Sequence, residues 1–254
     1  MKRILPALAT LPRPVFGRNE SLAPGMWTET HSHPWCQLSY AVSGVLAVTT
    51  PQGDYVAPPR YAVWIPPGVP HQVFNRGRTE MRSLYLAAGA PGLPEACAVL
   101  EVDGLLRELI VKAGALAPDY APEGPAGRLV AVLLDALAAA RQVGFVLPLA
   151  KDRRLLPIQA ALQDNPADAR TLADWAAQAG ASERTLARLF VKETGLGFGE
   201  WRRRLRLLLS LSALEAGSSV TAVALGAGYD STSAFIAAFR ETFGFTPGAF
   251  PTRG

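Results

Sequence analysis

Short apolar runs, each closed off by glycine or proline, fill the first third of the chain. Between residues 27 and 86 they are rich in Val, Tyr, Trp and Thr. A turn residue recurs roughly every 8–12 positions, which is typical of a β-sandwich or barrel. The segments are 36–44, 45–53, 55–68, 71–77 and 81–89. The pattern predicts a β-barrel domain in this part of the chain.

The middle of the chain changes to a helical period. Residues 103–116 and 126–143 place Leu, Ile and Val at steps of three and four, which predicts two amphipathic helices. We expect their apolar stripe to pack against the barrel as part of the core. The alternative is that the stripe forms a dimer seam. The stripe consists of Leu105, Leu106, Leu109, Leu129, Val132, Leu133 and Leu137.

From residue 152 onward the pattern is helical throughout, with breakers at Gly180, Gly195, Gly217, Gly228 and Gly244. We therefore expect three regions. Residues 1–100 form the barrel, residues 101–150 a helical dimerisation or linker region, and residues 151–254 a separate helical domain.

Composition excludes several classes of protein. The chain has 254 residues, 49% hydrophobic and 18% charged, which is enough apolar material for a globular core and argues against disorder. No apolar run approaches the roughly 20 residues of a membrane span, and prolines at 6, 12 and 14 interrupt any secretory signal. We expect a cytoplasmic protein with no membrane partner. Cys36 and Cys97 lack C-x-x-C spacing, so we expect both to be reduced.

Net charge by itself does not indicate a nucleic-acid ligand. It is +4, from 25 basic and 21 acidic residues. Four arginines are nevertheless concentrated between residues 202 and 206. Such a run either contacts phosphates or forms a solvated helix face, and the sequence favours neither.

The three histidines of the chain lie in two compact blocks. His31 and His33 are alternate residues, so on a strand their side chains share one face. The first block comprises Gly25, His31, His33, Gln37 and Gly44, and the second Pro66, Gly68, His71 and Asn75.

In order and spacing these blocks resemble the two motifs of the cupin fold, a double-stranded β-helix or jelly-roll barrel. Two positions depart from the family pattern: Gln37 stands where cupins have glutamate, and Arg60 where the second motif opens with glycine. The resemblance implies one divalent ion, Zn, Fe, Ni or Cu, held by His31, His33, Gln37 and His71. The alternatives are a metal-free pocket in which these groups hydrogen-bond a small molecule, and purely structural histidines.

Aromatic residues surround the histidine blocks and predict the wall of a small-molecule pocket, with barrel core as the alternative. They are Trp35, Tyr40, Trp64 and Tyr85.

Two segments in the last hundred residues share one layout. In 171–195 and in 219–244 an alanine is followed four residues later by a glycine, Ala176 and Gly180 in the first and Ala224 and Gly228 in the second. This spacing fits a helix-turn-helix, in which the small residue allows close packing and the glycine allows the turn.

The tandem arrangement over 155–251 resembles the AraC family of transcriptional regulators, many of which carry a cupin domain first. The family's closing pattern is matched by Phe239, Phe243, Gly244, Pro247 and Phe250. Pro251 departs from it, since arginine commonly follows the aromatic residue, and the departure removes one expected backbone contact.

Within these motifs the outward-facing residues are the candidate DNA contacts. Arg184 and Arg188 lie one helical turn apart and can each bind a guanine bidentately, with Thr185 beside them. In the second motif Ile236 and Ala237 replace longer polar residues, so we expect that helix to make mostly phosphate and methyl contacts. Its candidates are Thr232, Ser233 and Arg240.

Together the sequence predicts a two-domain α+β protein: a cupin barrel followed by helices, and an all-α domain with two helix-turn-helix motifs. It predicts a sequence-specific DNA-binding regulator, activator or repressor, whose cupin domain senses a small molecule or a divalent metal. The expected partners are double-stranded DNA, that effector, a second copy of the chain and RNA polymerase.

Two other functions are weighed against this one. The first is a cupin metalloenzyme of dioxygenase or isomerase type with a helical appendage, and the second is a helical protein-binding scaffold. We expect no enzyme, because an enzyme has no need of two recognition helices and the barrel's acids, Glu29, Asp54 and Glu80, are scattered. A scaffold leaves the histidines unexplained.

Overall fold

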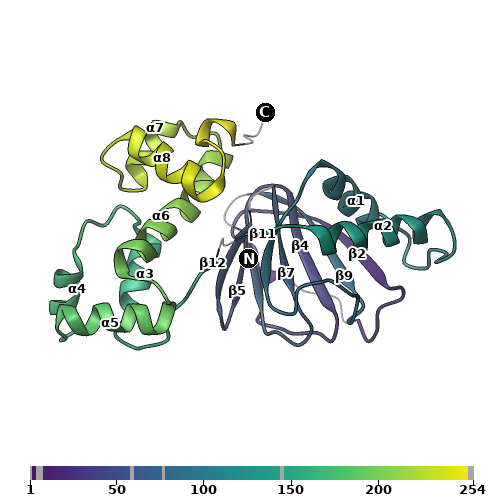
Figure 1. Ribbon diagram of the computed structural model, residues 1–254, viewed down its shortest axis with the longest axis horizontal. Helices are drawn as coiled ribbons and strands as arrows, with labels where there is room; N and C mark the ends of the chain where they lie inside the picture. Colours follow the sequence, from purple (N-terminus) through teal and green to yellow (C-terminus); the bar gives the residue numbers. More distant parts are fainter. Residues whose placement is uncertain (1, 4–7, 58–59, 76–77, 144–145, 251–254) are drawn as a thin grey trace. The chain divides into compact units, whose positions relative to one another are not determined.

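The computed structural model describes residues 2–3, 8–57, 60–75, 78–143 and 146–250. The chain divides into two compact units, Met1–Val146 and Leu147–Gly254, which we describe separately (Figure 1). Among the described residues, no helix combines the length and the apolar character needed to cross a membrane. Pro251 lies outside the described residues.

Two six-stranded sheets form the first unit. One sheet has the order β1 (Lys2–Arg3), β3 (Trp27–Thr28), β8 (Gln72–Asn75), β5 (Leu46–Thr50), β6 (Gly53–Ala57) and β12 (Val146–Leu147). The other has the order β11 (Gln142–Val143), β10 (Ala98–Glu101), β7 (Tyr61–Ile65), β4 (Cys36–Ser43), β9 (Thr79–Leu86) and β2 (Val15–Leu22). In the second sheet, β4 pairs antiparallel with both β7 and β9.

Strand β4 shows how the sequence assigns the two faces of the second sheet. Alternation places Cys36, Leu38 and Tyr40 on one face, where they join a core cluster with residues of α1 (Gly104–Gly114) and α2 (Pro125–Ala139). Figure 1 shows the two helices lying against this sheet. The other face carries Gln37, which lies directly across from Tyr85 of β9.

The second of the two helices ends earlier than the sequence predicts. The helix expected to reach residue 143 stops at Ala139, because Ala140 is extended. Gln142 and Val143 instead pair with Leu100 and Val99 of β10. The expected helical boundary was therefore wrong by four residues: a partner strand from elsewhere in the sequence overrode the local period.

After Leu147, the last residue of β12, helices make up the regular structure of the described residues of the second unit. They are α3 (Leu156–Asp164), α4 (Leu172–Gln178), α5 (Glu183–Thr194), α6 (Phe198–Glu215), α7 (Val220–Gly226), α8 (Thr232–Phe243) and the short 3-10 helix η1 (Pro247–Ala249). The pairs α4–α5 and α7–α8 are the two helix-turn-helix motifs, and α6 joins them.

Side-chain caps explain why these helices begin where they do. Thr171 and Asp174 form a capping box at the start of α4. Hydroxyl groups of Ser182, Ser219 and Ser231 accept backbone N–H groups at the starts of α5, α7 and α8. Because these signals are local, the motifs can be located from the sequence.

Candidate sensor site and nucleic-acid interface

The three histidines come together in the first unit. The backbones of His31 and His71 exchange two hydrogen bonds of 3.0 and 2.9 Å, which brings the two sequence blocks side by side. The ring centroids of His31 and His71 are 4.3 Å apart, and that of His33 lies 5.1 Å from His71. One ligating nitrogen from each ring lies within 4.8 Å of the others.

Backbone carbonyls orient all three rings in the same sense. The Nδ1 atoms of His31, His33 and His71 lie 2.8, 2.8 and 2.9 Å from carbonyl oxygens of Glu29, Trp35 and Val69 respectively. Since a carbonyl only accepts, each Nδ1 carries a proton and, in a neutral ring, each Nε2 carries the lone pair. This orientation is the one that metal-binding histidines commonly adopt.

His71 is the innermost ring. Its side chain is fully buried, and burial lowers its pKa to about 4, with neighbouring His31 and His33 adding charge repulsion. The ring is therefore neutral near pH 7. Its buried Nε2 has no hydrogen-bond partner among the described residues. An unpaired buried acceptor is costly, so this atom fits a metal ion or a ligand donor.

Gln37 is a buried polar neighbour of the cluster. Its Oε1 lies 2.9 Å from His33 Nε2, and its Nε2 donates to Ser39 Oγ at 2.8 Å. Nδ1 of His33 is protonated, so there are two ways to form this hydrogen bond. Either the ring is a doubly protonated imidazolium and Nε2 donates to Oε1, or the ring is neutral, the Gln37 amide is flipped by 180°, and Nε2 accepts from the amide NH₂ group. The amide brings no negative charge to the site.

Two of the four predicted aromatic residues lie at the cluster. Trp35 stacks on His33, with centroids 5.3 Å apart and an interplanar angle of 9°, and Tyr85 meets His33 edge-on at 5.7 Å. Sequence reasoning missed Phe16, which stacks on Tyr85 at 6.2 Å, and Arg18, whose Nη1 donates to the Tyr85 hydroxyl at 3.2 Å. Both come from β2, and their placement follows from its register with β9.

Tyr40 and Trp64 lie elsewhere, which corrects their assignment to the pocket wall. Both are fully buried in the core cluster beneath α1 and α2. Tyr40 is three residues from Gln37 and so points to the opposite face of β4. Trp64 pairs with Leu38 on that same face, and its Nε1 donates to the Pro94 carbonyl at 2.8 Å.

Helix α5 presents the predicted arginines to solvent. Arg184 and Arg188 are exposed, whereas Leu186 and Phe190 are completely buried on the other side. Thr185 is half-buried, and its Oγ1 lies 2.8 Å from the Ser182 hydroxyl, so it also contributes to the start of the helix. The two arginines are thus available for contact with DNA bases.

Helix α8 is similarly amphipathic but carries fewer polar groups outward. Ser233 and Arg240 are exposed and Thr232 is half-buried, while Phe235 and Phe239 are fully buried. Arg240 lies in the last turn of the helix. Base contacts usually come from the N-terminal residues of a recognition helix, so this position is better suited to a phosphate.

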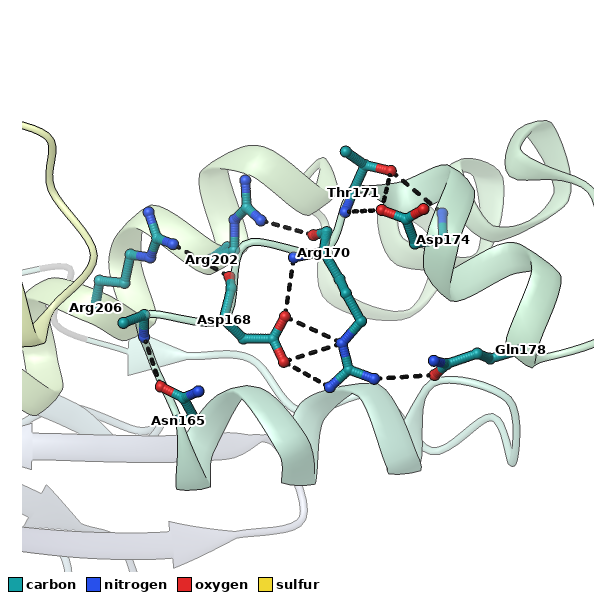
Figure 2. A network of polar contacts seen from close by, with 9 residues as sticks. Asn165, Asp168, Arg170, Thr171, Asp174, Gln178, Arg202 and Arg206 are labelled. Carbon is teal, nitrogen blue, oxygen red and sulfur yellow. Dashed lines mark hydrogen bonds and ion pairs between the residues drawn. The ribbon is translucent and has the colours of Figure 1, made fainter.

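The arginines at the start of α6 are engaged within the second unit. Arg203 pairs with Glu200 and Glu241, and Arg204 with Glu200. Figure 2 shows Arg202 and Arg206 reaching the loop before α4, where Arg202 Nη1 donates to the Arg170 carbonyl at 3.0 Å. The arginines between residues 202 and 206 therefore make contacts within the unit and do not simply form a solvated helix face.

Comparison with known proteins agrees with this architecture. The chain matches the model of the cupin domain over residues 19–86 and that of a helix-turn-helix domain over residues 175–253. It is 36% identical over 223 residues to the HTH-type transcriptional regulator NimR of Escherichia coli K12, covering 88% of this chain and 82% of that protein. It is 39% identical over 105 residues to the regulator RipA of Corynebacterium glutamicum, covering 41% of this chain and 32% of RipA.

Solved structures similar to this chain include ToxT from Vibrio cholerae, with 9% identity, a TM-score of 0.39 and coverage of 92% of this chain and 97% of ToxT. The DNA-binding domain of AdpA, in complex with target DNA, has 30% identity and a TM-score of 0.36, and the match covers 38% of this chain and 88% of that domain.

The fold and the relatives define a DNA-binding transcriptional regulator with a cupin ligand-sensing domain. The chain belongs to the AraC family of transcriptional regulators. The predicted family, two-domain fold class and regulatory function are confirmed, and the relatives are regulators and not enzymes.

Proposed function

We propose that this regulator senses its effector at the three-histidine cluster, and that a divalent metal ion held by His31, His33 and His71 forms part of the sensor site. The observation that carries the proposal is the shared orientation of the three rings. Each is fixed through Nδ1 to a carbonyl, so that in the neutral ring its Nε2 carries the lone pair that a metal ion would use. The buried, unpartnered Nε2 of His71 supports it further.

The donor set suits zinc, iron, nickel or copper, all of which accept imidazole nitrogen. Gln37 would offer its amide oxygen as a neutral fourth ligand. When bound, the ion would supply a Lewis-acidic position for a lone pair of the effector. Trp35 and Tyr85 would provide the apolar wall against which the effector lies.

A metal-free pocket is the second candidate. It is favoured by one contact, the 2.9 Å approach of Gln37 to His33 Nε2, which occupies a would-be ligand atom. In that case the hydrogen-bonded side chains of His33, Gln37 and Ser39 would bind a polar effector directly.

Elemental analysis of the purified full-length protein separates these candidates. We expect about one equivalent of transition metal per chain in the wild type and its loss in the His31→Ala/His71→Ala variant. Trp35→Phe is the matched control, because it alters the same site without removing a ligand atom, and it should retain the metal. Equal metal content in wild type and double variant, including none in either, would remove the ion from the proposal.

For the DNA-binding unit we propose that α5 is the main base-reading helix, through Arg184 and Arg188 with Thr185. Helix α8 would contribute Thr232 and Ser233 near its N-terminus and Arg240 as a phosphate contact. The exposure of the two arginines above a fully buried apolar side supports this division.

We also propose that the regulator is a homodimer whose seam includes α2. Val132 on this helix is 48% exposed and Leu105 on α1 is 63% exposed, although other residues of the same stripe, such as Leu133, are completely buried. Large exposed apolar side chains on adjacent helices suit contact with a second copy.

A further inference from the structure

One arginine joins the two halves of the DNA-binding unit. Arg206 lies in α6, and its Nε donates to the Pro166 carbonyl at 2.7 Å. Its Nη1 donates to the Gly228 carbonyl at 3.1 Å and its Nη2 to the Asp168 carbonyl at 3.4 Å. Pro166 and Asp168 belong to the loop before the first helix-turn-helix motif, and Gly228 to the turn of the second. A single guanidinium therefore bonds the loop before the first motif and the turn of the second motif at once.

Backbone packing at the same junction is equally close. Gly228 has a φ of +76°, and a Cβ placed there would lie 2.8 Å from Ala167 Cα and 2.8 Å from Arg206 Nη2. Only glycine combines this backbone conformation with this clearance. Gly180 holds the matching turn position of the first motif with a φ of +61°, yet a Cβ there would meet nothing within 4 Å. The tight contact is a property of the second motif alone.

The loop that receives Arg206 is itself fixed to the first motif. Arg170 forms an ion pair with Asp168 and donates to Gln178 of α4 at 3.1 Å (Figure 2). Its guanidinium also lies 3.6 Å above the centre of the Trp175 ring. A continuous series of contacts thus runs from the turn before α8, through Arg206 and the loop, to α4. Because α4 packs directly on α5, the series connects both recognition helices.

Partial burial of Arg206 makes these bonds hard to replace. Burial lowers its pKa, and the nearby Arg202 acts in the same direction. The guanidinium is held at the junction by carbonyl oxygens of three residues, and an uncharged side chain there would leave those oxygens without their donor.

We propose that Arg206 is a positioning residue that fixes α8 relative to α5 and thereby sets the spacing between the two DNA boxes that the regulator accepts. The inference rests on the proposed reading of DNA by both helices. Paired recognition helices read boxes about one helical turn, roughly 34 Å, apart, so an altered angle between them changes the spacer that fits.

The test uses the full-length protein and duplexes selected by the wild type from a randomised pool. The spacer between the two boxes of a selected duplex is then lengthened by one base pair or by about half a helical turn, roughly five base pairs. We expect the wild type to lose about tenfold or more in affinity on the altered spacers. Arg206→Met should lose affinity for the selected duplex and show nearly equal affinities across the spacer series, and Arg206→Lys should fall between the two.

Two matched controls isolate the junction. Arg202→Met removes an arginine that donates to the Arg170 carbonyl in the first half, and it should retain the spacer preference. Gly228→Ala should reproduce the Arg206→Met profile, whereas Gly180→Ala introduces comparable backbone strain without the clash and should not. Circular dichroism establishes folding, and Arg206→Lys takes the place of any Arg206 variant that does not fold.

Two results would overturn the inference, and they differ in kind. A wild-type spacer preference in Arg206→Met, or its equal loss in Arg202→Met, removes the role of Arg206 and leaves DNA reading by both helices intact. A wild type that binds all spacers equally contradicts the two-helix reading itself, and the role of Arg206 fails with it.

Discussion

At the scale of single residues, hydrogen-bond partners decide what each side chain can do. In each of the three imidazoles Nδ1 is held by a backbone carbonyl, so that Nε2 carries the lone pair in the neutral ring. Gln37 is the one member of the cluster whose chemistry departs from that of metal-binding cupins, because an amide oxygen is a weaker ligand than a carboxylate.

Substituting Gln37 tests its place in the sensor site. We expect Gln37→Glu to bind Zn²⁺ or Ni²⁺ about tenfold tighter at neutral pH, since the carboxylate compensates part of the ion's charge. Competition with a chromophoric chelator measures this. Ser39→Ala, which removes one of the two hydrogen-bond partners of the Gln37 amide and adds no charge, should not tighten binding. Unchanged affinity in Gln37→Glu would mean that position 37 does not contact the ion.

Arg188 offers the matching test in the DNA-binding unit. Arg188→Ala should weaken binding to a selected duplex by about 1–3 kcal/mol, the loss expected for one bidentate arginine–guanine contact. Fluorescence anisotropy provides the measurement. Arg60→Ala is the control, because it removes the same charge from an exposed position of the first unit that lies outside α1 and α2. A comparable loss in both variants would indicate general charge attraction and not base reading.

At the scale of elements, local signals place the helices and distant partners decide where some of them end. Capping serines and the glycines after α5 and α8 are visible in the sequence, so these helices are found close to their observed bounds. Helix α2 stops early because residues 142–143 join β10. Its apolar stripe is divided by packing into a buried side against the sheet and an exposed side.

That exposed side carries a prediction about assembly. If α2 forms the dimer seam, Val132→Asp should convert the wild-type dimer to a monomer, because a buried, unpaired carboxylate is strongly unfavourable at an interface. Sedimentation velocity without DNA measures this change. Val191→Asp alters a similarly exposed valine on α5, 54% against 48%, and should leave the dimer intact. A dimer that survives Val132→Asp would place the seam elsewhere.

At the scale of the whole molecule, a sensor must change how the DNA-binding unit behaves. Such coupling between sites is typically about 1–3 kcal/mol, and it acts in both directions. The two compact units are joined through a single crossing of the chain near residue 146. Occupancy of the histidine cluster should therefore be measurable as a change in DNA affinity.

We expect added Zn²⁺ or Ni²⁺ to shift the affinity of the full-length protein for its selected duplex by about fivefold or more, with chelator reversing the shift. The His31→Ala/His71→Ala variant should bind the same duplex without responding to the metal. An equal response in wild type and variant would show that the ion acts on the DNA or at another site.

The sequence by itself determined the family and the two-domain architecture, and its short spacings gave the candidate residues of both proposed sites. His31, His33 and His71 lie in two compact motifs, and Arg184 and Arg188 lie one helical turn apart. These patterns can be recognised in the sequence because the spacing within each motif reflects the geometry of a single strand or helix.

Only the tertiary structure decided features that depend on pairing between distant segments. It placed Tyr40 and Trp64 beneath the helices and brought Phe16 of β2 onto Tyr85 of β9. It also showed that Arg206, one of four arginines between residues 202 and 206, donates hydrogen bonds to the carbonyls of residues 166, 168 and 228. Register and long-range packing set these contacts, and neither is encoded in any single window of the chain.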